Sequence, residues 1–234
     1  MKIGILVPLP QELSSLTKIK LQPGNCVGLT ENIRVCLSGV GRKPTRLGFE
    51  KLLSDPVDLV ISWGSAAGLN KAVEAGDLLI PEAINVGNQM IHTNYDFNHQ
   101  LISNLPHTLR INREPLAECK GILATVEDKS NLYAATGCVA GDMESGALAQ
   151  MAAQHQVPFA VIRSVVDEAD MPLPSALLKG FGKGRFDLPA FLGRALINPS
   201  DWPLIIKLAM NFKKVKKTLN IASDIIKTNS NTWR

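Results

Sequence analysis

Short, continuous runs of apolar residues recur along most of the chain. Runs of this length, bounded by Gly, Pro or charged residues, are typical of strands buried on both faces of a sheet. The predicted strands cover residues 3–7, 33–37, 58–62, 78–80, 121–125 and 159–166. Two segments between them, 45–53 and 143–154, have the spacing of helices. Alternating strands and helices predict an α/β sandwich.

Acids and glycines gather where the predicted strands end. Glu12 follows the first strand, the turns at 38–42 and 64–68 follow the next two, and Asp167 ends the last. The polar segment 85–100 predicts a long loop of the kind that carries binding groups. Because ligands of such sheets bind outside the carboxyl ends of the strands, we expect the functional site at this edge.

The pattern changes near residue 199. From there apolar residues recur at helical spacing, and lysines fill positions between them. The apolar positions are Leu204, Ile205, Leu208, Phe212, Val215 and Leu219. We therefore expect a domain over 1–198 and a basic amphipathic helical tail over 199–234. Two roles stay open for this helix: covering the protein's own core or a subunit interface, or contacting an anionic membrane through residues 202–219.

Composition narrows the classes of function. The chain has 234 residues, of which 45% are hydrophobic and 20% charged, and a net charge of +4, which is ordinary for a globular protein. Its basic residues are not interleaved with aromatic ones, which argues against nucleic-acid binding, and no apolar run is long enough to span a bilayer. The cysteines lack the spacing of a zinc site, so we expect reduced thiols, a cytoplasmic protein and no metal. They are Cys26, Cys36, Cys119 and Cys138.

Several sequence blocks resemble the 5'-methylthioadenosine/S-adenosylhomocysteine nucleosidases and purine nucleoside phosphorylases. The blocks are 1–5 with Glu12, 38–41, 64–69 with 76–77, and 143–145 with 163–170. The resemblance covers about residues 1–180. It implies a three-layer αβα sandwich around a central mixed sheet and a homodimeric enzyme that cleaves N-glycosidic bonds without a cofactor.

The resemblance also implies roles for individual residues. Cleavage of a purine N-glycosidic bond needs a proton for the leaving base, a stabilised ribosyl group and a nucleophile. Asp167 matches the acid that protonates N7 of the base, and a raised pKa would suit that role. Glu12 matches the base that activates water, while Met143 and Glu144 match residues that hold the ribose. The residues expected to contact nucleoside or phosphate are Gly39, Gly41, Arg42, Gly64, Ser65 and Arg163.

Purely structural roles are the alternatives for the charged residues. Asp167 could cap the turn that follows its strand, and Glu144 could be a favourable charge at a helix N-terminus. Glu12 could be a solvated acid in the first turn of a helix. Arg163, four residues before Asp167 and hence on the same strand face, could pair with an acid, and Arg42 could simply be solvated.

Two departures from the family pattern bear on the reaction. Phosphorylases hold phosphate with an arginine where this chain has Ser62, so hydrolysis is favoured over a phosphorolysis that uses Arg42 or Arg163. The aromatic residue that stacks on adenine in nucleosidases is missing from 125–130, although adenine is still favoured by the overall match. An alternative of another class is a catalytically silent nucleoside-binding or membrane-docked partner protein; retention of both Glu12 and Asp167 argues against it.

The C-terminal region resembles the hopanoid-associated phosphorylase branch of the family. The resemblance rests on residues 169–174, 184–187 and 199, together with the helix at 204–219. It implies an adenine nucleoside with a bulky, lipid-like 5' substituent, such as adenosylhopane. The basic helix would suit such a substrate, since its apolar face and lysines could hold the enzyme at the inner face of a membrane.

Overall fold

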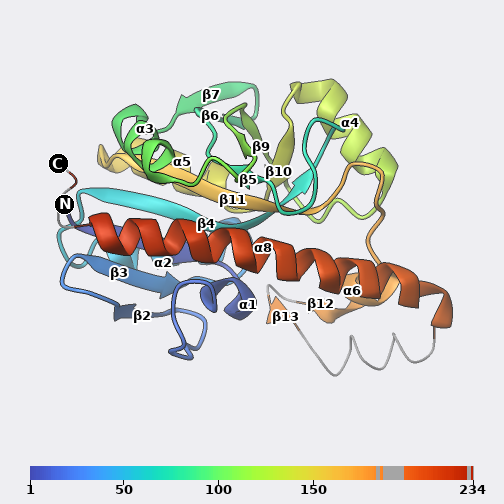
Figure 1. Cartoon of the computed structure of the whole chain (residues 1–234), viewed down its shortest axis with the longest axis horizontal. Helices are drawn as coiled ribbons and strands as arrows, with labels where there is room; N and C mark the ends of the chain where they lie inside the picture. Colours follow the sequence, from blue (N-terminus) through green and yellow to red (C-terminus); the bar gives the residue numbers. More distant parts are fainter. Residues whose placement is uncertain (183–184, 187–197, 231–232, 234) are drawn as a thin grey trace.

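A twisted mixed sheet runs through the computed structural model, which describes residues 1–182, 185–186, 198–230 and 233 (Figure 1). The strands of this sheet are β1 (Ile3–Val7), β2 (Asn25–Gly28), β3 (Ile33–Leu37), β4 (Leu59–Gly68), β5 (Leu78–Leu79), β6 (Ala83–Val86), β7 (Gln89–His92), β8 (Ile111–Asn112), β9 (Leu116–Glu118), β10 (Ala140–Asp142) and β11 (Phe159–Asp167). A separate antiparallel pair joins β12 (Phe181–Gly182) to β13 (Arg185–Phe186). The described helices are α1 (Pro10–Leu13), α2 (Arg42–Leu52), α3 (Tyr95–Asn104), α4 (Val126–Thr136), α5 (Ser145–His155), α6 (Ser175–Gly180), the short 3₁₀ helix η1 (Pro199–Asp201) and α8 (Trp202–Asn229).

Both parallel and antiparallel pairs occur in the sheet. Strand β1 lies between β3 and β4 and is parallel to both, and β11 is parallel to β4. Strand β10 runs antiparallel to β4 and parallel to β9. The central mixed sheet expected from the resemblance is therefore confirmed. The parallel strands β1, β3, β4 and β11 end at one edge, as the sequence predicted for the site.

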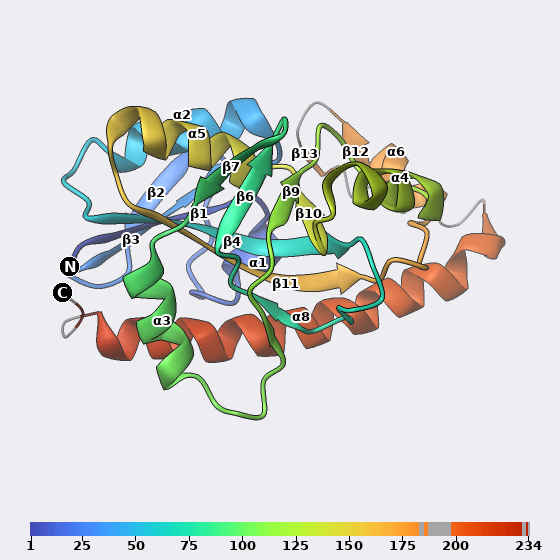
Figure 2. The same ribbon diagram turned by 90° about the horizontal axis from the view of Figure 1, so that it is seen from above.

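Helices cover both faces of the sheet, which confirms the three-layer α/β sandwich. In Figure 2, α2 and α5 lie on one side of the strands, and α3 and α8 lie on the other. Side chains alternate between the two cores because a strand points successive residues to opposite faces. Ile5 and Val7 pack in the core that contains α8 residues, whereas Leu6 packs with Phe49 of α2.

Three predicted local structures are wrong. Residues 64–68 continue β4, because they pair with β11 and β10 and so are not a turn. Residues 121–125 form no strand; Thr125 is the N-cap of α4. Residues 85–100 form the β6–β7 hairpin and most of α3, because Gly87 and Asn88 both take the positive φ values of a tight hairpin turn.

Helix α8 packs along the protein's own sheet. It is longer than predicted, and its buried side chains join the core shared with β1, β4 and β11. Leu208, Val215 and Leu219 are buried there, which settles the role of the apolar face in favour of the protein's own core. The expected boundary at 198 adjoins undescribed residues, and that division stays a prediction. Gly184 and Asp187 of the tail resemblance lie outside the described residues. Within the described ranges, no helix has the length and apolar character needed to cross a membrane.

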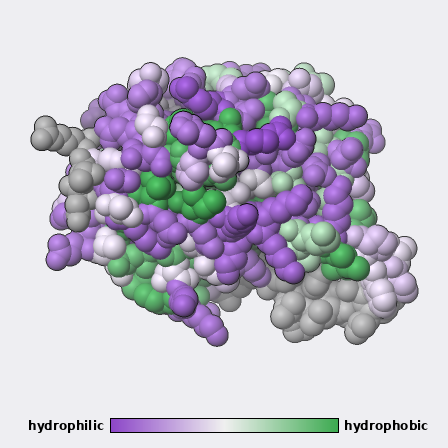
Figure 3. All heavy atoms as spheres, viewed as in Figure 1, coloured by the Kyte–Doolittle hydropathy of each residue, from purple (hydrophilic) through white to green (hydrophobic). Residues whose placement is uncertain are grey.

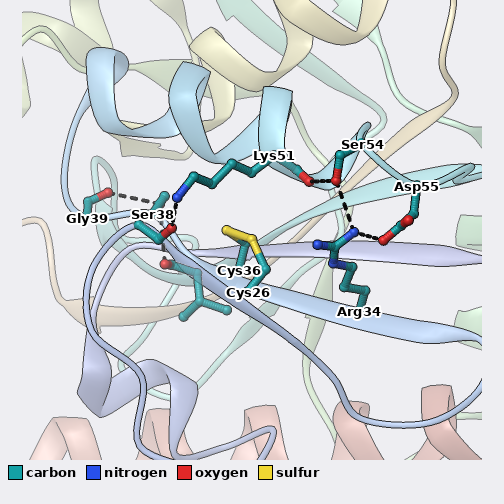
Figure 4. The surroundings of a disulfide bond; sticks show 10 residues. Cys26, Arg34, Cys36, Ser38, Gly39, Lys51, Ser54 and Asp55 are labelled. Carbon is teal, nitrogen blue, oxygen red and sulfur yellow. Dashed lines mark hydrogen bonds and ion pairs between the residues drawn. A yellow bond between two sulfur atoms is a disulfide. The ribbon is translucent and has the colours of Figure 1, made fainter.

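Two of the cysteines are joined in a disulfide, which corrects the prediction of four reduced thiols. Strands β2 and β3 are antiparallel, and their register places Cys26 directly opposite Cys36 with a Cα–Cα distance of 4.0 Å. Figure 4 shows the bond between these strands beside α2, with the side chains of Lys51 and Arg34 around it. Cys119 and Cys138 are free and buried, as predicted. Spacing alone did not reveal the pair because the β2–β3 register brings it together.

Candidate active site

The predicted acids meet at a cavity of about 400 Å³ on the carboxyl edge of the parallel strands. Glu12, Glu144 and Asp167 all line it, together with Met143 and Ser65. Glu12 lies on α1 just after β1, and Ser65 lies in β4. Met143 and Glu144 directly follow β10, and Asp167 ends β11; β4 pairs with β1, β10 and β11, which brings these segments together. The other lining residues are Pro8, Leu9, Gln11, Val40, Ala66, Ala67, Cys119, Gly121, Ile122, Leu123, Gly141, Asp142, Val166, Leu173, Leu177, Ile205, Leu208, Ala209 and Phe212.

Glu12 is held rigidly in the wall of this cavity and is 3% exposed, so it is not a solvated acid. Its Oε1 accepts hydrogen bonds from the backbone N–H of Ser65 at 2.7 Å and from the Ser65 hydroxyl at 2.6 Å. Its Oε2 accepts one from the backbone N–H of Leu9 at 3.1 Å. Burial raises the pKa of Glu12, although the charge of Arg163 and these hydrogen bonds oppose the rise. A buried carboxylate with a raised pKa is a stronger base than an exposed one.

Glu144 and Arg163 form a buried cluster with Asp142. Arg163 is fully buried, and its Nε lies 2.9 Å from Asp142 while its Nη2 lies 3.4 Å from Glu144. Nη2 also donates to the Ser62 hydroxyl at 2.8 Å. Burial raises the pKa of Glu144 against the opposing charge of Arg163. The expected pairing of Arg163 with acids is therefore present, and its guanidinium is not among the groups that line the cavity.

Glu144 begins helix α5 but does not cap it. It occupies the N-cap position, yet its side chain makes no capping hydrogen bond. Instead, Oε1 accepts from the backbone N–H of Gly41 at 2.8 Å, across the sheet edge. The backbone N–H groups of Glu144 and Ser145 are bound by Asp142 Oδ1, which leaves Glu144 turned toward the cavity.

Asp167 lies at the end of β11, where the strand is irregular. The register with β4 shifts between Val165 and Asp167, so counting alternate residues from Arg163 does not give the direction of Asp167. A bulge of this kind re-aims a side chain, and bulges are common next to active sites. The Asp167 carboxylate is 3% exposed and contacts Lys129 Nζ at 2.5 Å. Burial raises its pKa, while the charge of Lys129 opposes the rise.

The remaining predicted residues divide into two groups. Gly41 and Gly64 lie against the acid cluster: a Cβ on Gly64 would lie 2.5 Å from Arg163 and 2.8 Å from the Glu12 carboxylate. Gly39 takes a positive φ of 95° in the same turn as Gly41. Arg42 does not line the cavity; it forms an ion pair with Glu118 and donates a hydrogen bond to Gln150 at 2.5 Å. It is therefore neither free in solvent nor part of the cavity wall.

Sequence reasoning missed Lys129 and Asp142. Asp142 directly precedes the Met143–Ser145 block, so its place in the motif was a usable signal. Lys129 belongs to a polar helix with no apolar stripe, and its burial and its contact with Asp167 are seen in the folded structure alone. Within the described part of the chain, no three or more His, Cys, Asp and Glu side chains gather as they would around a metal ion.

The cavity therefore carries carboxyl groups at its buried end and apolar side chains elsewhere. Two of its acids, Glu12 and Asp167, have raised pKa values and separate polar partners, Ser65 for Glu12 and Lys129 for Asp167, which suits one to accept and the other to donate a proton. Of the described residues that line the cavity, none is a lysine or an arginine.

Known proteins share both the sequence pattern and the fold. A family model described as the phosphorylase superfamily matches residues 2–183. A 5'-methylthioadenosine/S-adenosylhomocysteine nucleosidase of Buchnera aphidicola is 29% identical over 202 residues, which cover 73% of this chain and 85% of that protein.

Solved structures extend the likeness of the fold to nearly the whole chain. The Helicobacter pylori nucleosidase of the same name has a TM-score of 0.70 and 19% identity, and the alignment covers 99% of this chain and 98% of that one. The futalosine hydrolase of H. pylori has a TM-score of 0.68 and 17% identity, with coverage of 99% and 98%. Because the family model matches most of the chain, the chain belongs to the phosphorylase superfamily and is an enzyme that cleaves glycosidic bonds.

Proposed function

We propose that this enzyme hydrolyses the N-glycosidic bond of an adenine nucleoside whose 5' carbon bears a large apolar group, as in adenosylhopane. The observation that carries the proposal is the division of the cavity. Its acids are buried, whereas Leu177 of α6 and Ile205 and Phe212 of α8 are partly exposed. Adenine as the base is supported by relatives that are named for adenosine derivatives.

Water suits this cavity better than phosphate. Glu12, Asp142, Glu144 and Asp167 line it, and they would repel a phosphate dianion unless cations compensated. Arg163, the alternative phosphate ligand, is fully buried and engaged by Asp142, Glu144 and Ser62. Arg42 is bound by Glu118. Hydrolysis therefore needs no rearrangement of these cations, whereas phosphorolysis would have to release one of them.

The outer part of the cavity favours an apolar 5' group. Leu173 and Leu177 on one side and Ile205, Leu208 and Phe212 of α8 on the other form this part. Each buried methylene of a ligand gains about 0.8 kcal/mol from such surroundings. A cavity of about 400 Å³ cannot enclose a nucleoside together with a pentacyclic lipid, so the end of a large substituent would emerge beside α8.

Each acid has one step in the proposed reaction. Asp167 gives a proton to N7 of adenine as the glycosidic bond breaks, and the bonding electrons leave with the base. Glu144 accepts hydrogen bonds from the ribose hydroxyls, and Met143 packs against the sugar. Glu12 takes a proton from the attacking water, whose oxygen forms the new bond to the ribosyl carbon. The products are adenine and the 5'-substituted ribose.

An assay of adenine release tests this proposal. We expect release from 5'-alkylthioadenosines at the same rate with and without phosphate, with kcat/KM rising as the alkyl chain lengthens. Phe212→Ser and Leu177→Ser should remove most of this rise while leaving cleavage of unsubstituted adenosine within about twofold, because they alter only the apolar end. Phosphate-dependent release would establish phosphorolysis instead, and tight binding without release would establish the silent nucleoside-binding protein.

We also propose that α8 brings the enzyme to an anionic membrane surface. One face of α8 packs in the core, and a second stripe on the helix is exposed: Trp202, Ile206 and Met210 are 51%, 60% and 58% exposed and recur every four residues. Figure 3 shows hydrophobic patches among the mostly hydrophilic residues on this side of the molecule. Ile205 and Ala209, next to this stripe, line the cavity. A lipid substituent emerging there would point toward the membrane.

Sedimentation with vesicles measures this contact. We expect binding to phosphatidylglycerol vesicles, weaker binding to phosphatidylcholine vesicles, and loss of binding when Trp202, Ile206 and Met210 are all replaced by serine. Replacement of the exposed hydrophobic residues Tyr95 and Met90, which lie far from α8 in the sequence, is the matched control. If the triple variant still sediments, the stripe is not the contact. The homodimer expected from the resemblance stays a prediction that light scattering can measure.

A further inference from the structure

Lys129 is an unusual residue for its position. Helix α4 contributes one fully buried side chain among its described residues, and that side chain is this lysine. Its ammonium group contacts Asp167 Oδ2 at 2.5 Å and donates to the backbone carbonyls of Glu168 at 2.6 Å and Met171 at 2.8 Å. Two hydrogen bonds to main-chain carbonyls and one ion pair therefore hold this ammonium group.

Stability alone gives no reason for a buried charge here. Removing a lysine and a carboxylate from water costs several kcal/mol for each ion, and apolar residues of similar volume often replace such a pair without loss of stability. The pair instead lies at the proposed acid, where a positive charge would stabilise the carboxylate left after proton transfer. Asp167 is the cavity-lining acid, and Lys129 approaches it from behind, since Lys129 is not among the lining residues.

We propose that Lys129 is a positioning residue for Asp167: it holds Oδ2 so that Oδ1 faces the base, and its charge stabilises the carboxylate that remains after the proton is transferred. This inference rests on the proposed reaction. The atoms balance without a further reactant, because the proton moves from Asp167 to N7 and Lys129 keeps all of its own protons. The two carbonyl contacts fix the ammonium group at the end of β11. Its position therefore does not depend on the position of the Asp167 carboxylate.

The sign of the pH effect follows from the charges around Asp167. Burial raises the pKa of Asp167, Lys129 lowers it, and Glu168, the residue that follows the strand, raises it. Glu168 is itself paired with Lys207 of α8 at 2.7 Å. The Cys119 thiol also lies near, but burial raises its pKa so far that it stays neutral. Loss of Lys129 should therefore raise the pKa of Asp167 further. Because the acid acts only when protonated, the alkaline limb of the rate profile should move to higher pH.

A double-mutant cycle with Lys129→Gln and Asp167→Asn tests the proposal. Glutamine removes the charge but keeps amide donors for the carbonyls of Glu168 and Met171, which limits damage to the fold. We expect Lys129→Gln to lower kcat about 10- to 100-fold in the otherwise unchanged enzyme and less than twofold in the Asp167→Asn background, since residues that act as one unit are not additive. Lys129→Arg should recover part of the rate. Lys207→Met, which removes the partner of the neighbouring Glu168, is the matched control and should stay within twofold.

A second measurement does not depend on turnover. Carbon-13 NMR of labelled aspartate, with the signal of Asp167 assigned by its loss in Asp167→Asn, should show a higher pKa for this carboxyl in Lys129→Gln than in the unchanged protein. An unchanged pKa, or an equal loss of kcat in both backgrounds of the cycle, would overturn the inference and leave Lys129 with a structural role. Absence of adenine release from the unchanged enzyme would instead refute the proposed function, and the NMR result would still decide whether Lys129 controls Asp167.

Discussion

Asp167→Asn should lower kcat for adenine release by about 10²- to 10⁴-fold, the usual contribution of a general acid. Asparagine has nearly the same shape and lines the same cavity, but it cannot give a proton to N7. The substitution also leaves the buried ammonium of Lys129 without its carboxylate partner, which costs about 3–5 kcal/mol of stability. Thermal unfolding must therefore be measured beside the rate, at a temperature where the variant stays folded.

Glu168→Gln is the matched control for this substitution. Glu168 is the next residue, carries the same charge and pairs with Lys207 on the outer side of the site. We expect the rate of adenine release by Glu168→Gln to stay within about twofold of that of the unchanged enzyme. A substrate with 7-deazaadenine as its base should bind but not react, because it has no N7 to protonate. Full activity of Asp167→Asn, or cleavage of the 7-deaza compound at the normal rate, would show that Asp167 is not the acid.

Glu12→Gln should abolish most hydrolysis, again by about 10²- to 10⁴-fold. The amide fills the same space beside Ser65 but cannot take a proton from water. In the unchanged enzyme Glu12 must be ionised to act. Because its pKa is raised, the rate should fall as the pH drops through a value above the ordinary range of a glutamate. This acid limb should be absent from the remaining activity of Glu12→Gln.

Ser65→Ala gives an independent measurement of the same group. The Ser65 hydroxyl donates to Glu12 Oε1 and so stabilises the ionised form. Its removal should raise the pKa of Glu12 and move the acid limb to higher pH, with only a modest loss of maximal rate. Glu118→Gln is the control, since the Glu118 side chain is largely buried and pairs with Arg42 outside the cavity. An acid limb that does not move in Ser65→Ala would assign that limb to another residue, and a near-normal rate in Glu12→Gln would remove Glu12 from the mechanism.

The two substitutions also separate the competing reactions. If phosphate were the nucleophile, Glu12→Gln would lower the rate of adenine release only a little, because phosphate needs no base. Asp167→Asn would lower this rate as much as in hydrolysis. If the protein only bound nucleosides, neither substitution would alter a rate, and both would alter affinity alone. The proposed hydrolysis predicts a large fall in the rate of adenine release in both variants.

The main strands and the acids at their ends could be predicted from the local pattern of residues. Buried strands such as β1, β3 and β11 are continuous apolar runs, and a strand end is a local property, so Glu12 and Asp167 could be placed without contacts. The family pattern added Glu144 for the same reason, because a motif is local too. Short strands such as β8 and β9 were missed, because a pair or trio of residues carries no periodicity of its own.

Which charges meet depends instead on the packing of the folded chain. Arg163 is taken up by Asp142 and Glu144, and Lys129 reaches Asp167 from a different helix, through distances that no spacing along the chain encodes. The disulfide and the apolar end of the cavity also depend on tertiary contacts. Helix α8 contributes to this end of the cavity from far along the chain. Such contacts depend on how the sheet and helices pack, whereas the strands themselves depend on the local pattern of apolar residues.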